Sequence, residues 1–446
     1  MNSGFEFPDK KITVNLAPAD LPKEGSRFDL AIALGILVAS GQLPASAVHG
    51  FEFYGELALS GELRPVIGEI PLALAAKAQG AALILPMTNA QIAQQVPEVA
   101  IFGATHILQV HSFLLGQQAL PAIPAVPSEV VSAGLCLSEV KGQQHAKRAL
   151  LLAAGGEHNL LMYGPPGTGK SMLAQRLAAL LPPLTGEEAL ESAALYSIAG
   201  LTRPNHWLSR PFRQPHHTSS AIALVGGGSV PRPGEISLSH CGVLFLDELP
   251  EFPRQVLDVM RQPLETGTIH ISRAGRQAEF PARFQLIAAL NPSPSGHHQD
   301  GRCSKEQILR YLNRISGPFS DRIDLQVEVP LLTPEALNQP QLAETSQQLA
   351  LLVAQSRHTQ LARQGKPNAQ LQPAELAQFA PLCDADQQFL QQAVQQLQLS
   401  TRSYHKLWKV ARSIADHHKE GQIRREHLLE ALSFRAYDKL LAYLRA

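Results

Sequence analysis

The sequence predicts an α/β protein in which a parallel sheet carries a phosphate-binding loop and is followed by a helical region. Three observations predict this fold class. Residues 164–171 read Gly-Pro-Pro-Gly-Thr-Gly-Lys-Ser, a complete phosphate-loop pattern. Residues 135–332 alternate strand and helix signals, as parallel α/β cores do. Residues 333–446 are rich in glutamine, leucine and alanine, and their apolar positions follow a helical period.

The sequence of the N-terminal part predicts a separate domain of mixed strands and helices over residues 1–118. Within it, alternating apolar residues predict a half-buried strand over 11–16, and an almost wholly apolar stretch predicts a buried helix over 28–39. A second apolar run predicts a strand over 81–86. Prolines spaced among small residues then mark a linker over 119–134.

The remaining sequence divides into a core over 135–332 and an all-helical lid over 333–446. In the lid, 387–399 and 401–418 read as amphipathic helices, and Gly421 is a stop signal. Paired glutamines recur along the first of these helices, and we interpret them as its polar face.

The composition is that of a globular protein with ample apolar material. The chain has 446 residues, of which 45% are hydrophobic and 17% charged, which is enough for several domains. Its formal net charge is zero, so global charge neither favours nor excludes a nucleic-acid partner. We find no signal sequence, no apolar run that could span a membrane and no paired cysteine spacing. We therefore expect a cytoplasmic protein without a membrane partner.

The phosphate loop has the flanking elements that its chemistry requires. An apolar run over 159–163 predicts a buried strand before the loop, and 171–178 reads as a helix after it. This context disfavours the alternative of a chance glycine-rich turn. We expect Lys170 to reach the outer phosphates of ATP and Ser171 to hold Mg²⁺. The residues expected to bind ATP are Gly164, Pro165, Pro166, Gly167, Thr168, Gly169, Lys170 and Ser171.

Two later strands end in polar residues that suit ATP hydrolysis. The run 243–246 ends at Asp247 and Glu248, and we expect the first to share the Mg²⁺ shell and the second to deprotonate the attacking water. The run 284–290 ends at Asn291, which we expect to position that water. Acid pairs at surface strand ends and asparagines in turns are common, so each assignment depends on the order of the motifs.

Two arginines complete the predicted catalytic set. Arg322 precedes a strand over 325–329, and we expect it to act as a finger on a neighbouring subunit's nucleotide. Arg402 opens a helix of the lid, and we expect it to reach back to the phosphates. The alternative for each arginine is a surface salt bridge.

This ordered set resembles the AAA+ ATPases, and more narrowly the magnesium-chelatase-like group with its ComM/YifB type. The resemblance covers nearly the whole chain. Its most specific segments are residues 140–149, 211–218, 226–228, 316–319 and 410–416. It implies a ring-forming ATPase that uses ATP and Mg²⁺, and for the ComM type a hexameric DNA helicase that promotes branch migration in natural transformation.

The group also carries two insertions that are implied to face the pore of the ring. One matches residues 211–234, and the other is a hairpin around 268–276, where isoleucines alternate with polar residues. Arg273 and Arg276 at the tip of this hairpin are our candidates for binding DNA phosphates without reading sequence. The alternative is an ordinary exposed hairpin with solvated arginines.

The N-terminal part resembles the Lon-like domain of the same group, which has the fold of ribosomal S5 domain 2. Segments 22–27, 55–57 and 66–68 carry this match. The positions of the peptidase serine and lysine fall on Arg27 and Leu72, so we expect no peptidase activity.

The chain departs from the group's pattern in two places. Group members begin further upstream, so we expect this domain to be truncated at its start and to expose a sheet edge. Serines also replace the cysteines that follow Asn291 and Pro292 in the group. Cys303, His297 and His298 remain as a weak candidate zinc set, because a structural site needs four ligands.

We therefore expect a homo-hexameric, ATP-driven motor that moves DNA independently of sequence. One alternative is a magnesium-chelatase-type motor subunit that remodels a protein partner, and the Lon-like domain argues against it. Another is a nucleotide-gated scaffold, which the presence of Glu248 disfavours.

Overall fold

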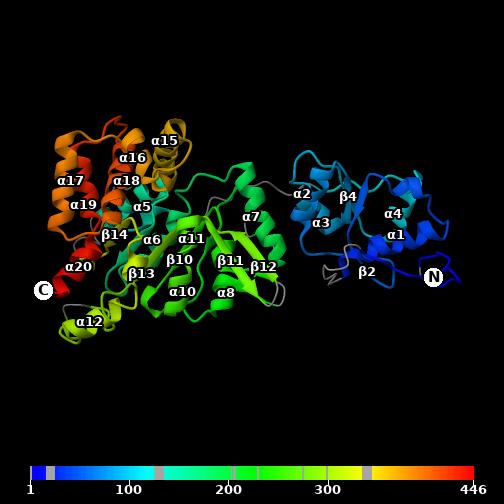
Figure 1. Ribbon diagram of the computed structural model, residues 1–446, viewed down its shortest axis with the longest axis horizontal. Coiled ribbons are helices and arrows are strands. Elements are labelled where there is room, and N and C mark those ends of the chain that lie inside the picture. Colours follow the sequence, from blue (N-terminus) through cyan, green and yellow to red (C-terminus); the bar gives the residue numbers. More distant parts are fainter. Residues whose placement is uncertain are drawn as a thin grey trace. The chain divides into compact units, whose positions relative to one another are not determined.

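The computed structural model describes most of the chain. The described residues are 3–16, 26–124, 135–201, 203, 207–228, 231–273, 276–297, 300–333 and 344–445, and the side chains of residues 273 and 276 are outside the description. Contacts divide the chain into two compact units (Figure 1). One comprises Met1–Glu129 with Gly186–Trp207, and the other comprises Val130–Thr185 with Leu208–Ala446. No helix in these described ranges is both long enough and apolar enough to cross a membrane.

The first unit is built on a parallel three-stranded sheet in the order β1-β4-β5. Its strands are β1 (Phe51–Phe53), β2 (Glu56–Leu57), β3 (Leu63–Arg64), β4 (Ala82–Pro86) and β5 (Ile101–Ala104). Its helices are α1 (Asp29–Ala39), α2 (Glu69–Gln79), α3 (Met87–Ala93), α4 (Ile107–Leu114) and α7 (Gly186–Ala199).

Successive residues of β4 point to opposite faces of this sheet, and each face has its own apolar cluster. Ile84 packs with Leu30 and Leu34 of α1, whereas Leu83 and Leu85 pack in the cluster on the other face. Helices therefore cover both faces, which explains why β4 reads as a continuous apolar run.

Helix α7 packs with the N-terminal unit although the sequence division assigns it to the core. Leu190, Ala193 and Ala194 lie against the cluster that contains Ile70 of α2, and the Ile70 backbone N–H donates to Ser197 Oγ at 3.5 Å. The contact grouping also keeps the predicted core and lid in one unit. The predicted limits of 1–118, 119–134, 135–332 and 333–446 thus remain a sequence-based division, and residues 125–134 and 334–343 lie outside the described ranges.

Two of the three predictions for the N-terminal part are confirmed. The expected helix over 28–39 is α1, and the expected strand over 81–86 is β4. The strand expected over 11–16 is wrong, because these residues form no strand and the side chains of Ile12 and Val14 are exposed. Alternating apolar residues make a strand only when a partner backbone and a covered face are available.

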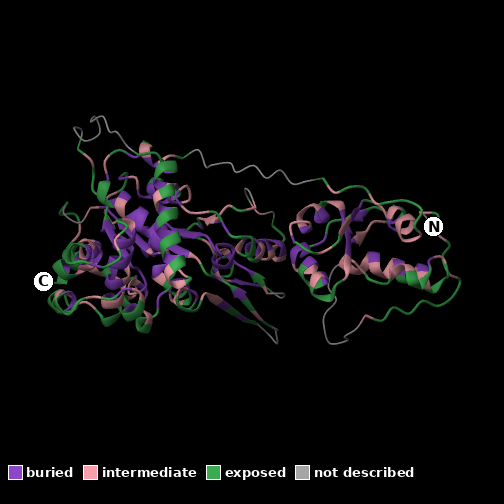
Figure 2. Ribbon diagram, turned by 90° about the horizontal axis from the view of Figure 1, so that it is seen from above, coloured by how far each residue is buried: buried purple, intermediate pink, exposed green. Residues whose placement is uncertain are grey.

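The second unit contains a five-stranded parallel sheet in the order β14-β6-β13-β10-β7. The strands of the unit are β6 (Leu160–Tyr163), β7 (Phe212–Arg213), β8 (Gly226–Gly227), β9 (Arg232–Pro233), β10 (Val243–Leu246), β11 (Thr268–Arg273), β12 (Arg276–Pro281), β13 (Gln285–Leu290) and β14 (Leu325–Glu328). The central strands β6, β10 and β13 are buried along their whole length (Figure 2), as their apolar sequences require. The parallel pairing confirms the parallel α/β core that the sequence predicts.

The helices of this unit surround the sheet and form the C-terminal region. They are α5 (Gln144–Gly156), α6 (Lys170–Leu177), α8 (Ala221–Val225), α9 (Glu235–Leu238), α10 (Arg254–Val259), α11 (Pro263–Thr266), α12 (Lys305–Leu312), α13 (Gly317–Ser320), α15 (Ser346–Gln364), α16 (Pro373–Phe379), α17 (Asp384–Gln396), α18 (Thr401–His417), α19 (Arg425–Ser433) and α20 (Ala436–Arg445). The two predicted lid helices are confirmed as α17 and α18. The paired glutamines of α17 are exposed, as expected for its polar face.

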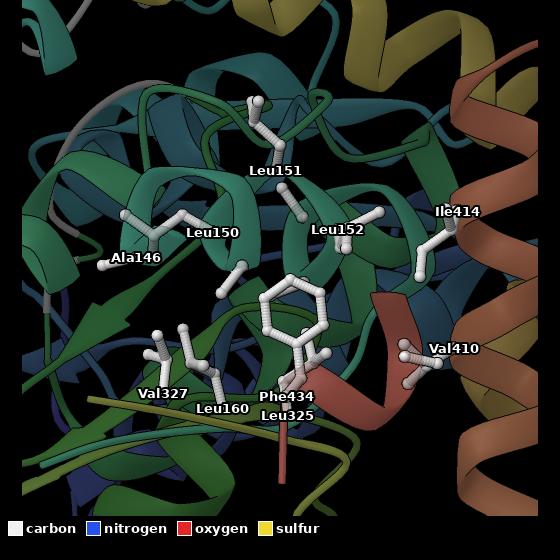
Figure 3. Packing of buried hydrophobic residues seen from close by; sticks show 14 of the residues in the cluster. Ala146, Leu150, Leu151, Leu152, Leu160, Leu325, Val327, Val410, Ile414 and Phe434 are labelled. Atoms are coloured by element: carbon white, nitrogen blue, oxygen red, sulfur yellow. The ribbon is translucent and has the colours of Figure 1, made fainter. Parts of the chain in front are cut away.

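One apolar cluster joins the sheet to the C-terminal helices. In Figure 3, Phe434 lies close to Leu160 and Leu325 of the sheet, and Val410 and Ile414 approach from α18. A buried ion pair adds to this contact, since Lys406 Nζ of α18 lies 2.9 Å from Asp324 Oδ1 just before β14. The lid is therefore anchored at the edge of the sheet where β14 begins.

Candidate nucleotide-binding site

The phosphate loop connects the carboxyl end of β6 to the start of α6. Gly167 and Gly169 have φ angles of 78° and 89°, a region that residues with a Cβ atom rarely occupy. Gly164 is needed for a different reason, because a Cβ atom there would lie 2.1 Å from the carbonyl oxygen of Val329. The loop can therefore present its backbone N–H groups only with glycine at these positions.

Lys170 is buried at the start of α6 and lies at the centre of the site. Its Nζ donates to the carbonyl oxygens of Gly164 at 2.7 Å and Pro165 at 2.8 Å, and to Asn291 Oδ1 at 3.1 Å. Burial lowers the pKa of the ammonium group, while Asp247 and Glu248 oppose that shift. The structure thus brings the predicted lysine and asparagine together, although they come from different parts of the chain.

Ser171 and Asp247 also meet, as a magnesium site requires. Ser171 Oγ donates to Asp247 Oδ2 at 2.6 Å, which joins the start of α6 to the end of β10. A hydroxyl and a carboxylate are hard oxygen donors of the kind that Mg²⁺ prefers, usually with phosphate and water completing the shell. These two side chains fit the ion that normally accompanies ATP.

Glu248 has a constrained backbone and a partner that the sequence reasoning missed. Its φ angle is 52°, an uncommon value for a residue with a side chain, and its backbone N–H donates to Asp247 Oδ1 at 2.9 Å. The carboxylate is half-exposed, and its Oε2 lies 3.1 Å from Nδ1 of His217. The resemblance singles out segment 211–218, but no local pattern assigns a role to His217 within it.

A cleft of about 720 Å³ lies beside these residues. Glu248 and Asn291 line one part of it, and Arg302, Arg310 and Arg314 from the region around α12 line another. The cleft leaves room for water next to the predicted water-activating carboxylate, and its arginines add positive charge nearby.

Arg322 lies at the opposite edge of the sheet from the phosphate loop. It lies three residues before the start of β14, which runs parallel to β6 with Leu325 beside Leu160, whereas the loop follows the far end of β6. The four strand residues Leu325–Glu328 separate Arg322 from the level of the loop, or roughly 13 Å at about 3.3 Å per residue. Arg322 therefore cannot reach the loop of its own chain.

The Arg322 side chain is held by its own subunit. The guanidinium is 8% exposed, and its Nε donates to the carbonyl oxygen of Arg261 at 3.2 Å. Its other nitrogens donate to the carbonyl oxygen of Pro318 and to Glu265 Oε1.

Arg402, at the start of α18, lies beside Arg322 and not beside the phosphate loop of its own chain. Its side chain is 58% exposed, and one of its terminal nitrogens lies 3.6 Å from Glu265 Oε1. We expected Arg402 to reach back to the phosphates, but the packing of α18 at the start of β14 directs it to the other edge. Both arginines form an ion pair, which was the alternative reading of each in the sequence. Their shared partner, the Glu265 carboxylate, was not predicted.

The predicted hairpin is formed by β11 and β12, and it projects from the core (Figure 1). Ile269 and Ile271 are buried and His270 faces outward, so the alternation is as predicted. Arg273 and Arg276 are paired across the hairpin through their backbones. Their side chains and the turn residues 274–275 lie outside the description, so their contact with DNA remains a prediction.

The weak zinc prediction involves a residue outside the described ranges. Cys303 lines the cleft and the His297 carbonyl oxygen accepts a hydrogen bond from Ser293 Oγ at 2.8 Å, but His298 is not described. The zinc set stays a prediction.

The sequence matches known proteins along nearly its whole length. Family models described as "Magnesium chelatase, subunit ChlI", "Subunit ChlI of Mg-chelatase" and "Magnesium chelatase, subunit ChlI C-terminal" match residues 136–337, 1–89 and 343–435 respectively. The chain is 53% identical to "Competence protein ComM" of Haemophilus influenzae, over all of this chain and 89% of the relative. It is 49% identical to "Uncharacterized protein YifB" of Escherichia coli, with the same shares covered.

A more distant match connects the chain to the chelatases themselves. The "Magnesium-chelatase 38 kDa subunit" of Cereibacter sphaeroides is 28% identical over 43% of this chain and 61% of the relative. Together with the strand order and the phosphate loop, these matches show that the chain belongs to the ComM/YifB group of the magnesium-chelatase-like AAA+ family.

Proposed function

We propose that this chain hydrolyses ATP as one subunit of a homo-hexameric ring that moves DNA in the cytoplasm. The observation that carries this proposal is the separation of the catalytic groups. Lys170, Asp247 and Glu248 lie at the carboxyl edge of the sheet, where the parallel strands end. Arg322 lies at the amino edge, where the strands begin. In a ring of identical subunits, the amino edge of one subunit's sheet faces the carboxyl edge of the next subunit's sheet.

The chemistry at such a joint follows from the side chains. Lys170 and the loop N–H groups bind the phosphates, with Ser171 and Asp247 as the residues that would hold Mg²⁺, which neutralises phosphate charge when bound. Glu248 accepts a proton from the attacking water, and Asn291 orients that water. Arg322 of the adjoining subunit offsets charge on the transferring phosphoryl group.

DNA is proposed as the partner because of the hairpin and the relatives. The β11–β12 hairpin carries two arginines at its tip, which suits contact with phosphates of any sequence. The Haemophilus relative is named for competence, and the resemblance implies branch migration during natural transformation.

The alternative is a motor subunit of the magnesium-chelatase type, which acts on a protein partner. The chelatase subunit match and the family descriptions support this alternative. It predicts ATP turnover that DNA leaves unchanged.

The test is ATP turnover by the purified protein with and without forked or four-way-junction DNA, together with a branch-migration assay and the particle mass. We expect a six-subunit particle, DNA-stimulated turnover and junction movement. Turnover that ignores DNA, with no junction movement, would remove the DNA part of the proposal.

The hairpin arginines provide a sharper control. Replacing both Arg273 and Arg276 with alanine should weaken DNA binding for all sequences and reduce its dependence on salt, since fewer phosphate contacts are made. Turnover without DNA should be unchanged, because none of the described contacts of the phosphate site involves the hairpin. Equal DNA affinity for the double variant and the wild type would rule out this surface.

A further inference from the structure

Glu265 is the meeting point of the two arginines at the amino edge of the sheet. Its Oε1 accepts a hydrogen bond from Arg322 and lies 3.6 Å from a terminal nitrogen of Arg402. The carboxylate is 51% exposed, so another anion can approach the same arginines from solvent. One negative charge is thus shared by two positive charges at the surface.

The arginines converge on Glu265 as they would on a phosphate oxygen. A guanidinium binds carboxylates and phosphates with the same planar set of N–H groups. Arg322 donates hydrogen bonds to the backbone carbonyl oxygens of Arg261 and Pro318, and these two contacts fix its position. A third hydrogen bond goes to Glu265. Of these three contacts, only the one with Glu265 is to a carboxylate, so a phosphate has to replace this contact and can leave the other two intact.

Glu265 is also attached directly to the hairpin that is proposed to bind DNA. It lies near the end of α11, and β11 begins at Thr268. Between them Gly267 has a φ of 71°, and its carbonyl oxygen accepts the Ala282 N–H at 2.7 Å, which closes the base of the hairpin. A movement of the hairpin at its base therefore displaces the carboxylate at the same time.

We propose that Glu265 is a positioning residue that restrains Arg322 and Arg402 until the terminal phosphate of ATP on the adjoining subunit takes its place. DNA on the hairpin draws Glu265 away and so promotes this exchange. The inference depends on the proposed function, because it describes how DNA occupancy regulates that same site. By thermodynamic linkage, phosphate binding to the arginines must favour the DNA-binding position of the hairpin by the same factor by which DNA favours phosphate binding.

The test compares Glu265→Gln with Glu426→Gln, using ATP turnover with and without DNA. Glu426 is a matched control, since it is 65% exposed and its Oε1 lies 3.7 Å from an Arg424 nitrogen, and it belongs to α19 of the lid whereas Glu265 belongs to the core. We expect Glu265→Gln to raise the DNA-free kcat about two- to fivefold, the effect of one half-exposed ion pair. Its KM for ATP should be unchanged, and its stimulation by DNA should fall by the same factor.

The two expected changes also separate this inference from the function on which it depends. A DNA-free kcat equal to or below that of Glu426→Gln would overturn the restraint by Glu265. If wild-type turnover ignores DNA, the proposed function fails, while the DNA-free kcat of Glu265→Gln still decides whether the carboxylate restrains the arginines.

Mixed rings show whether the effect crosses the subunit interface. Subunits with Arg322→Ala keep an intact phosphate site, and Glu248→Gln subunits supply arginines without turning over ATP themselves. Donors that carry both Glu248→Gln and Glu265→Gln should restore more activity to Arg322→Ala subunits than donors with Glu248→Gln alone. Equal restoration by both donors would contradict the proposal, and the particle mass verifies that both donors assemble.

Discussion

The two edges of the central sheet carry two separate groups of side chains, which we propose to combine between subunits in one catalytic arrangement. At the carboxyl edge, Ser171 contacts Asp247 and Lys170 contacts Asn291, beside the phosphate loop. At the amino edge, Arg322 and Arg402 converge on Glu265, and none of their described contacts is with the phosphate loop. The difference follows from the fold, because parallel strands collect their carboxyl ends on one side, and a side chain before β14 is on the other. This separation is the basis of our proposal that the protomer shares a site with a second copy.

The largest expected effect concerns the carboxyl edge alone. Glu248→Gln should lower kcat by about 10²- to 10⁴-fold, because the amide cannot accept the proton of the attacking water. ATP affinity should remain close to that of the wild type, since Lys170 and the loop are unchanged. Turnover and equilibrium nucleotide binding measure these two quantities, and an unchanged kcat would show that another group activates the water.

The next largest expected effect distinguishes an arginine at the amino edge from one at the carboxyl edge. Arg322→Ala should lower kcat by about 10³-fold through the lost charge stabilisation, with little change in particle mass. Arg310→Ala is the matched control, because Arg310 lines the cleft of its own phosphate site. A greater loss for Arg310→Ala than for Arg322→Ala would mean that the stabilising arginine comes from the same subunit.

A stability measurement tests how the lid is fixed to the amino edge. Burial acts to raise the pKa of the Asp324 carboxyl, but Lys406 and His158 outweigh burial and lower that pKa well below its usual range. A lowered folded-state pKa contributes stability above the unfolded value of about 3.9, and this stability is lost as the pH falls toward the folded value. The free energy of unfolding should therefore decrease as the pH is lowered below about 5.

Replacement of this carboxylate should remove that pH dependence. Asp324→Asn should cost about 3 kcal/mol at neutral pH, because it leaves Lys406 buried without its counter-ion. Denaturant unfolding at several pH values measures both effects. An Asp324→Asn variant that still loses the same stability in acid would assign the dependence to other carboxylates.

The smallest effect is expected from Arg402, which is more exposed and less closely held than Arg322. Arg402→Ala should lower kcat about tenfold or less, since an exposed arginine contributes less than a desolvated one. The activity lost in Arg402→Ala should be restored by neighbouring subunits with an intact Arg402, as for Arg322. Restoration for Arg322 but not for Arg402 would show that the two arginines serve different subunits.

The sequence predicted most of the carboxyl edge because its chemistry follows directly after buried strands. Glu248 and Asn291 are recognisable from the apolar runs that precede them, and parallel strands bring such ends together. The contact of His217 with Glu248 was not predictable, because it depends on the path of a loop. The same holds for Glu265 and for the position of Arg402, which the packing of α18 determines. Local alternation also failed at 11–16, where no partner strand is described.

The most direct measurement of the shared site is ATP turnover in mixtures of two inactive variants. Lys170→Ala subunits cannot hold the phosphates but supply an intact Arg322, and Arg322→Ala subunits hold ATP but supply no arginine. Mixed rings should regain turnover at each joint where an intact arginine faces an intact phosphate site. Turnover that stays at the level of the separate variants in rings shown to be mixed, or full activity of a wild-type protein kept monomeric, would contradict a site completed by an adjoining copy.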